Sequence, residues 1–223
     1  MAVDAPRGKV QFYVYALAEA GEQRRFTVGK RSLRAVVIDG VAAIIENRRE
    51  APRPTEAALR EQHAVVTMLS RRLEAVLPVR FGALFAADEL AARVARVRRA
   101  LLDALERVRG RVQMTVRVNA PPALPAAGSR PGTAYLKARL ERERAVRECV
   151  RRIGRVASRF AVDRRVDARN DGSGAAVYHL IDAADVEDYT AAIATLAPSL
   201  SPVRITVTGP WPAFAFGPEL KRK

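Results

Sequence analysis

Few side chains in this 223-residue sequence could carry chemistry. The candidates are two histidines, His63 and His179, and one cysteine, Cys149. A zinc site needs His and Cys ligands at close spacing, and a nucleophilic site needs a base beside its nucleophile. The three residues are far apart in the sequence, and each falls on the apolar face of an expected helix or inside an expected strand. We therefore expect structural roles for all three.

The segment at residues 21–30 (GEQRRFTVGK) ends in Gly-Lys, as phosphate-binding loops do. Such a loop also needs an earlier glycine at position 24 and a Ser or Thr directly after the lysine. Arg24 and Arg31 occupy these two positions, so we expect a turn without phosphate binding. Most acidic residues neighbour arginines or begin expected helices, which leaves no carboxylate pair suited to acid–base catalysis. The sequence therefore predicts a protein that is not an enzyme and has no cofactor and no metal site.

The sequence is strongly basic, with 39 Lys and Arg against 24 Asp and Glu and a formal charge of +15. Such a charge favours nucleic-acid binding, because phosphate neutralisation supplies most of the non-specific affinity. The charge is spread over both halves of the chain, so no basic arm stands out. The RNA-binding pattern of ferredoxin-like sheets fails at its nearest match, residues 80–85 (RFGALF), which lacks the glycine after the arginine and the central aromatic. A basic ferredoxin-like nucleic-acid-binding module remains the alternative function.

The overall composition is that of a folded protein, since hydrophobic residues make up 49% of the sequence. No apolar run reaches the roughly 20 residues that cross a bilayer. Residues 1–8 also lack the apolar stretch of a secretory signal. We expect a soluble, cytoplasmic protein that does not bind membranes.

The residue pattern up to position 119 predicts an antiparallel sheet covered on one side by two helices. Asp39-Gly40 separates two apolar runs and supplies the positive φ angles of a two-residue type I′ turn, so a hairpin is expected there. Apolar periodicity predicts strands at 9–17, 33–38, 41–46, 77–85 and 111–119 and helices at 55–76 and 88–110. We assign residues 9–119 to an N-terminal modified ferredoxin-like domain.

Residues 120–132 hold four prolines, which predicts a linker between two domains. Residues 133–223 then form a second α+β domain with a long charged helix and an extended aromatic tail. Its expected helices lie at 133–160 and 184–196, and its expected strands lie at 175–181 and 203–208. The charged residues 141–144 interrupt the apolar face of the long helix, so its first half should project into solvent. A two-stranded sheet is marginal alone, so we expect it to borrow a strand such as 111–118 or to dock on the first domain.

Four segments, correctly ordered along the chain, resemble signatures of the gas vesicle synthesis protein L/F family (GvpL/GvpF). They are residues 12–16 (FYVYA), residues 77–85 (LPVRFGALF) with His63 on a helix before them, residues 131–136 (PGTAYL), and residues 209–216 (GPWPAFAF). The resemblance spans residues 12 to 216, essentially the whole chain.

This resemblance implies a non-enzymatic accessory protein of gas vesicle assembly, located in the cytoplasm and associated with gas vesicles. The implied partners are the small hydrophobic shell protein and other gas vesicle accessory proteins, with no specific nucleic acid and no small-molecule substrate. A shell subunit that polymerises into an apolar-lined wall aggregates easily, so a soluble adaptor could cover its hydrophobic surface or its edge strands.

The resemblance also marks residues that are either structural or partner-binding. They are Arg80, Phe81, Gly82, Phe85, Gly132, Tyr135, Leu136, Trp211 and Phe214. We expect Phe81 to be buried, and Gly82 to let the backbone bend or approach a neighbouring element closely. For the tail at residues 209–216, we expect an extended segment that crosses the domain junction, with Trp211 buried between the two domains.

Overall fold

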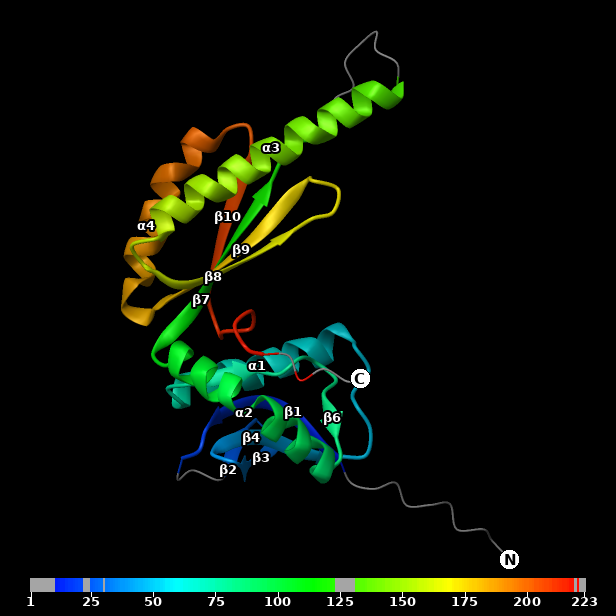
Figure 1. Ribbon diagram of the computed structural model, residues 1–223. Helices are drawn as coiled ribbons and strands as arrows, with labels where there is room; N and C mark the ends of the chain where they lie inside the picture. Colours follow the sequence, from blue (N-terminus) through cyan, green and yellow to red (C-terminus); the bar gives the residue numbers. More distant parts are fainter. Residues whose placement is uncertain (1–10, 22–24, 30, 123–130, 219, 221–223) are drawn as a thin grey trace, which may run out of the picture. The chain divides into compact units, whose positions relative to one another are not determined.

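The structure is a computed structural model that describes residues 11–21, 25–29, 31–122, 131–218 and 220, without the side chains of residues 131–134. The chain divides into two compact units (Figure 1). Unit 1 is Met1–Gly110 together with Pro212–Lys223, and unit 2 is Arg111–Trp211. The tail of the chain therefore belongs to the same unit as the N-terminal part.

Unit 1 contains an antiparallel sheet in the strand order β2-β3-β4-β1-β5, with β6 also paired to β1. Its strands are β1 (Gln11–Glu19), β2 (Arg25–Val28), β3 (Arg31–Ile38), β4 (Val41–Arg48), β5 (Val76–Pro78) and β6 (Leu84–Phe85). Asp39 and Gly40 join β3 to β4 with φ angles of 47° and 86°. Positive φ at both central residues is what a type I′ turn requires, so the predicted hairpin is confirmed.

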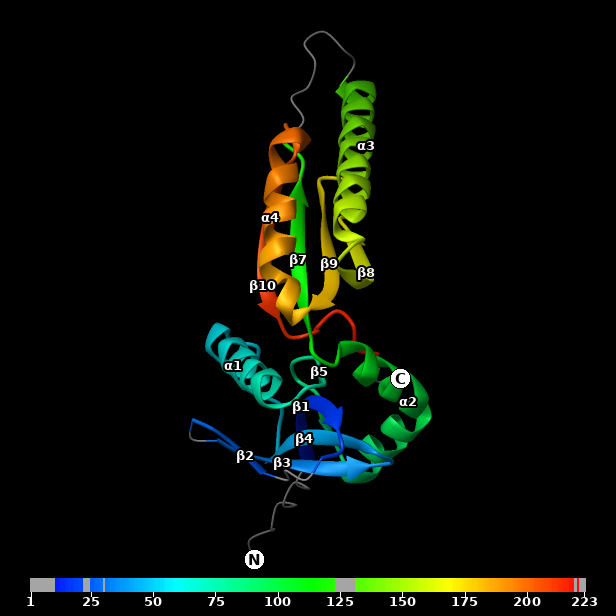
Figure 2. The ribbon, with the colours of Figure 1, turned by 90° about the vertical axis from the view of Figure 1, so that its left-hand side faces the viewer.

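Two helices cover the sheet of unit 1, α1 (Glu56–Arg72) and α2 (Ala87–Val108). Every residue of 14–18 in β1 and of 41–45 in β4 is buried, so both faces of these strands are covered. The face of Tyr13 and Ile44 packs against Val65 and Leu69 of α1, and α2 lies against the other face. Figure 2 shows β1 between the two helices. The predicted placement of both helices on one side is therefore wrong, because alternate residues of the central strands are apolar on both faces.

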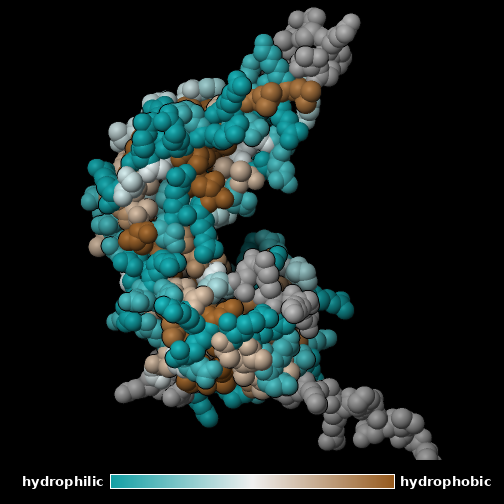
Figure 3. Space-filling model, in the orientation of Figure 1, coloured by the Kyte–Doolittle hydropathy of each residue, from teal (hydrophilic) through white to brown (hydrophobic). Residues whose placement is uncertain are grey.

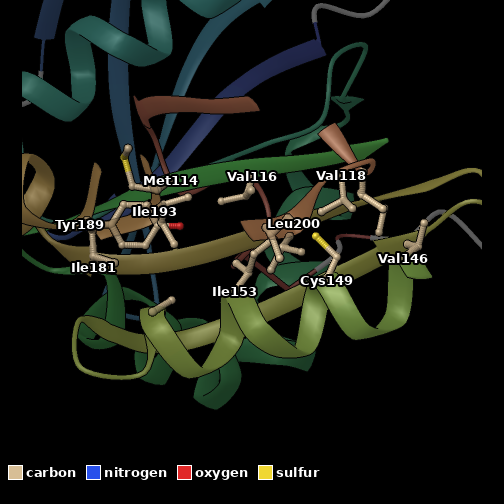
Figure 4. Packing of buried hydrophobic residues seen from close by; sticks show 14 residues of the cluster. Met114, Val116, Val118, Val146, Cys149, Ile153, Ile181, Tyr189, Ile193 and Leu200 are labelled. Atoms are coloured by element: carbon tan, nitrogen blue, oxygen red, sulfur yellow. The ribbon is translucent and has the colours of Figure 1, made fainter. Parts of the chain in front are cut away.

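Unit 2 has the element order βαββαβ and an antiparallel sheet in the order β10-β7-β9-β8. Its elements are β7 (Arg111–Asn119), α3 (Pro131–Ala157), β8 (Ala161–Ala168), β9 (Gly174–Asp182), α4 (Val186–Leu196) and β10 (Arg204–Trp211), with short 3-10 helices at Ala183–Asp185 and Ala197–Leu200. This is the ferredoxin-like topology. Figure 4 shows Cys149 and Ile153 of α3 together with Tyr189 of α4 beside Val116 of β7, so both helices cover the same face.

The α+β class is confirmed, and unit 2 corrects the details of the prediction. The ferredoxin-like topology was predicted for residues 9–119, but it belongs to residues 111–211. Strand 111–119 pairs with β9 and β10 in the centre of the second sheet, so the expected borrowing of this strand is confirmed and the predicted boundary after residue 119 is wrong. Its alternating pattern predicts a strand with one buried face, whereas residues 113–116 are all buried, so both faces of this stretch are covered.

The predicted linker at residues 120–132 is only partly described. Residues 123–130 lie outside the described residues, whereas Pro131 and Gly132 already belong to the first turn of α3. In the described part of the chain, no helix is long and apolar enough to span a membrane.

Candidate functional site

Unit 1 contains an apolar groove of about 710 Å³. Its walls come from β1, β5, the segment that joins β5 to β6, helix α2 and the C-terminal tail. The lining residues are Leu17, Leu77, Pro78, Val79, Arg80, Ala83, Phe85, Leu101, Phe214, Gly217, Pro218 and Leu220. Three of the residues marked in the sequence, Arg80, Phe85 and Phe214, therefore meet at one surface although more than 130 positions separate the first from the last.

The turn at residues 79–82 is held by two buried polar side chains, Tyr13 of β1 and Gln62 of α1. The backbone N–H of Gly82 donates to the Tyr13 hydroxyl at 3.2 Å, and this hydroxyl donates to Oε1 of Gln62. Nε2 of Gln62 in turn donates to the carbonyl of Val79 at 3.0 Å. Burial raises the pKa of Tyr13, so its hydroxyl keeps the proton that it donates. These bonds, the Tyr13–Gln62 hydrogen-bond chain, fix both ends of the turn that carries Arg80.

Gln62 belongs to this site, although nothing in the sequence marks it. The buried positions of α1 are Gln62, Val65, Val66 and Leu69, whereas Leu59 of the same helix is 47% exposed. Its spacing from residues 65, 66 and 69 places Gln62 on the buried face of the helix. This spacing does not predict a role for Gln62, because a glutamine on an apolar helix face does not reveal its hydrogen-bond partners.

The predicted roles in the Arg-Phe-Gly segment are met in part. Phe81 was expected to be buried but is only half-buried, with its ring edge-on to Tyr13 at 6.5 Å between centroids. Gly82 has φ +84° with open space where a Cβ would lie. The glycine therefore allows the backbone to bend at a positive φ angle, and no neighbouring element comes close to the position of a Cβ. The Arg80 side chain is exposed. Phe85 is buried, and the Arg93 guanidinium of α2 lies 5.1 Å from the centre of its ring.

The C-terminal tail forms the last wall of the groove. Phe216 is 1% exposed, and Gly217 lies close to Leu77 of β5. Phe214 is 44% exposed and stacks on the imidazole of His63, with 6.0 Å between the ring centres and 17° between the ring planes. His63 also lies 3.5 Å from the hydroxyl of Thr67. The two aromatic side chains therefore have different roles. Phe216 anchors the tail in unit 1, whereas Phe214 keeps much of its ring exposed to solvent.

Trp211 lies outside the groove, at the end of β10 in unit 2. It is half-buried and opposite Gln113 in the register, and its Nε1–H donates to Oγ1 of Thr208 at 3.3 Å. Residues 209–211 were expected in an extended tail but continue β10, where Pro210 is tolerated because β10 is at an edge of its sheet. The predicted position of Trp211 between the two domains stays a prediction.

The remaining marked residues lie at the start of α3. Gly132 is in its first turn, and Tyr135 and Leu136 are 57% and 58% exposed. Leu140 is also exposed, and Figure 3 shows a hydrophobic area of the surface near the N-terminal end of α3. An Arg139 Nη2 donates to the carbonyl of Asn170 at 2.8 Å. The first half of α3 is thus exposed, as expected, but is joined by this bond to the turn between β8 and β9.

The reactive residue types of unit 2 are buried in its core. His179 is fully buried, its Nδ1 lies 2.7 Å from the Tyr189 hydroxyl, and burial lowers its pKa to about 4. Burial also raises the pKa of the Cys149 thiol to about 11, which makes its thiolate scarce at neutral pH. Among the residues that the structure describes, no three His, Cys, Asp or Glu side chains come together as metal ligands would. What the site offers chemically is apolar contact area with one cation at its rim.

Comparisons with known proteins agree on one family. The family model described as "Gas vesicle synthesis protein GvpL/GvpF" matches residues 11–218. The crystal structure of the gas vesicle protein GvpF from Anabaena sp. PCC7120 is similar, with a TM-score of 0.73, 10% identity, and coverage of 93% of this chain and 98% of that chain. The crystal structure of GvpF from Microcystis aeruginosa has a TM-score of 0.70 and 12% identity, and covers 93% of this chain and 99% of that chain. No curated protein sequence matches the chain.

Proposed function

Because this chain belongs to the gas vesicle synthesis protein GvpL/GvpF family, we propose that it is a non-enzymatic accessory protein of gas vesicle assembly in the cytoplasm. Its partners are the small hydrophobic shell protein and other accessory proteins of the vesicle. The groove of unit 1 is the surface that takes the shell protein. The protein binds this partner and covers its apolar surface until the partner joins the vesicle wall.

One observation carries this proposal: residues of distant marked segments converge on a single apolar groove. Arg80 and Phe85 come from the segment at 77–85, and Phe214 comes from the segment at 209–216. Tyr13, from the segment at 12–16, fixes the turn beside them through the Tyr13–Gln62 hydrogen-bond chain. Since these segments share one surface, a common partner accounts for all of them together.

The physical basis of binding is burial of apolar surface. The groove has the volume of pockets that bury whole small ligands, and its walls are mostly aliphatic or aromatic. Removing such area from water is worth about 25 cal/mol per Å², and the gain does not depend on charge screening. Shell-protein binding should therefore persist at high salt concentration, unlike binding of a basic protein to a polyanion.

The test is capture of purified shell protein by the full chain, at physiological and at high salt. We expect capture at both, and a clear loss for Phe214→Ser, which removes the exposed ring from the groove wall. Leu59→Ser is the matched control, because Leu59 is an equally exposed apolar side chain of unit 1 outside the groove. Absence of capture by the wild-type chain would refute the proposal, and equal capture by both variants would refute the assignment to the groove.

A nucleic-acid-binding module is the second candidate, and unit 2 supplies the observation that favours it. Tyr178 of β9 lies on the sheet face away from the helices, because its neighbour Val177 packs in the core. The register places Arg165 of β8 directly opposite Tyr178, and an aromatic beside an arginine suits base stacking. Random single-stranded RNA should bind only weakly at physiological salt, whereas nanomolar, sequence-selective binding would favour this candidate over the shell-protein adaptor.

A further inference from the structure

The groove of unit 1 differs from an ordinary apolar pocket in having a single charged residue on its wall. Within the described part of the unit, Arg80 is the only charged residue that lines the groove. Its side chain is exposed and has neither a hydrogen bond nor an ion pair with the described residues. The cation therefore stands next to apolar surface without a compensating anion.

Other arginines near this part of unit 1 are already paired. Arg93, whose guanidinium lies over Phe85, is 2.7 Å from a carboxylate oxygen of Glu89. Arg31 and Arg48 share the carboxylate of Glu46 at 2.8 and 2.9 Å. These three arginines already form ion pairs within the protein. Of the four arginines, Arg80 is therefore the one that is placed to pair with an anion of a ligand.

The backbone that carries Arg80 is held in place before any ligand arrives. Val79 is bonded through its carbonyl to Gln62, and Gly82 is bonded through its N–H to Tyr13. The N–H of Val79 also donates to the carbonyl of Tyr15 at 2.9 Å. Fixing both flanks of the turn lowers the conformational entropy that binding has to remove, so a contact by Arg80 contributes more to affinity.

We propose that the groove binds an apolar peptide segment of the partner protein that bears a carboxylate, and that Arg80 pairs with this carboxylate. The guanidinium presents a planar fork of donors that matches a carboxylate in bidentate geometry. The apolar residues beside the carboxylate lie against Leu77, Phe85 and Phe214. This inference rests on the proposed function in one respect, namely that the occupant of the groove is a protein.

The test uses two synthetic peptides of leucine, valine and alanine, acetylated and amidated, that differ only in one central residue, glutamate or glutamine. Wild-type protein should bind the glutamate peptide about twofold to fivefold more tightly at neutral pH, which is the preference expected of an exposed charge pair. Arg80→Met should abolish this preference and Arg80→Lys should keep part of it. Arg60→Met should keep all of it, because Arg60 is an exposed arginine of α1 outside the groove.

The result that overturns the inference is equal affinity for both peptides, or a preference that survives Arg80→Met. Tighter binding of dodecanoate than of the glutamate peptide would also overturn it, by assigning the groove to a fatty acid.

Capture of shell protein by the variants distinguishes failure of this inference from failure of the proposed function. Capture lost in Phe214→Ser but unchanged in Arg80→Met would refute the role of Arg80 and leave the proposed function intact. Selective peptide binding without any shell-protein capture would refute the proposed function and leave the carboxylate site intact.

Discussion

The marked residues around the groove of unit 1 and those at the start of α3 in unit 2 have different surroundings. In unit 1, Phe85 is buried, and Phe214 and Arg80 border a groove whose turn is fixed by buried hydrogen bonds. In unit 2, Tyr135 and Leu136 lie exposed on the first half of α3. Large apolar or aromatic side chains thus line a groove in one unit and lie exposed on a helix surface in the other.

The difference shows that a family signature does not indicate by itself whether a residue packs or protrudes. A buried ring contributes to folding through the area it removes from water, and its loss leaves a cavity. An exposed side chain contributes almost nothing to the free energy of folding, so its removal weakens only the binding of a partner that covers it. Measured stabilities of variants in the two regions should therefore diverge.

The largest expected effect is that of Phe216→Ala in the tail. Phe216 is almost completely buried in unit 1, so its truncation should lower the free energy of unfolding by about 3–5 kcal/mol through lost burial and a residual cavity. Urea unfolding of the full chain measures this, with Leu136→Ala as the exposed control. A loss below about 1 kcal/mol would contradict the packing of the tail against unit 1.

The next effect is an acid sensitivity that resides in unit 2. The pKa of His179 falls from its usual 6.5 to about 4 in the folded chain, because burial disfavours the charged imidazole. Its contribution to stability is complete above pH 6.5 and is lost as the pH falls towards 4, by up to about 3 kcal/mol at 1.36 kcal/mol per unit of pKa.

Urea unfolding of the wild type and of His179→Gln at pH 7 and pH 5 measures this contribution. The variant should lose less stability than the wild type over this interval, whatever its stability at pH 7. Equal losses in the two proteins would show that other groups carry the acid sensitivity.

An intermediate effect is expected for the Tyr13–Gln62 hydrogen-bond chain. Gln62→Leu leaves the Tyr13 hydroxyl and the Val79 carbonyl without their partner, which should cost about 2 kcal/mol. Tyr13→Phe should have a similar cost, and the double variant should cost less than the sum because the two residues share one chain. Thermal unfolding of the three variants provides the measurement, and strictly additive losses would show that the two side chains act independently.

The smallest effect is expected for the exposed face of α3. The double variant Leu136→Ser with Leu140→Ser should change the free energy of unfolding by no more than about 0.5 kcal/mol, because both side chains are largely in water. Shell-protein capture should also be unchanged if the groove alone binds it. Reduced capture with unchanged stability would extend the binding surface to α3 and remove the contrast between the two regions.

Local features of the chain could be read from the sequence because their causes are local. Asp39-Gly40 predicted the hairpin, since only the backbone of these two residues must adopt positive φ. Helix α1 begins at Glu56, one residue after the predicted start, where the Thr55 side chain accepts a hydrogen bond from the N–H of Ala58 as an N-cap residue does. The four marked segments likewise indicated the family before the structure placed them.

The tertiary structure alone decided which elements share a sheet and which residues share a surface. The alternation in segment 111–119 predicts a strand, but its partners β9 and β10 are set by contacts distant in sequence. The same holds for Gln62, whose partners come from β1 and from the turn after β5, and for Phe214, which meets Arg80 only because the tail folds back onto unit 1. Residue patterns report the period of burial along one element, whereas pairing between elements depends on the packing of the whole chain.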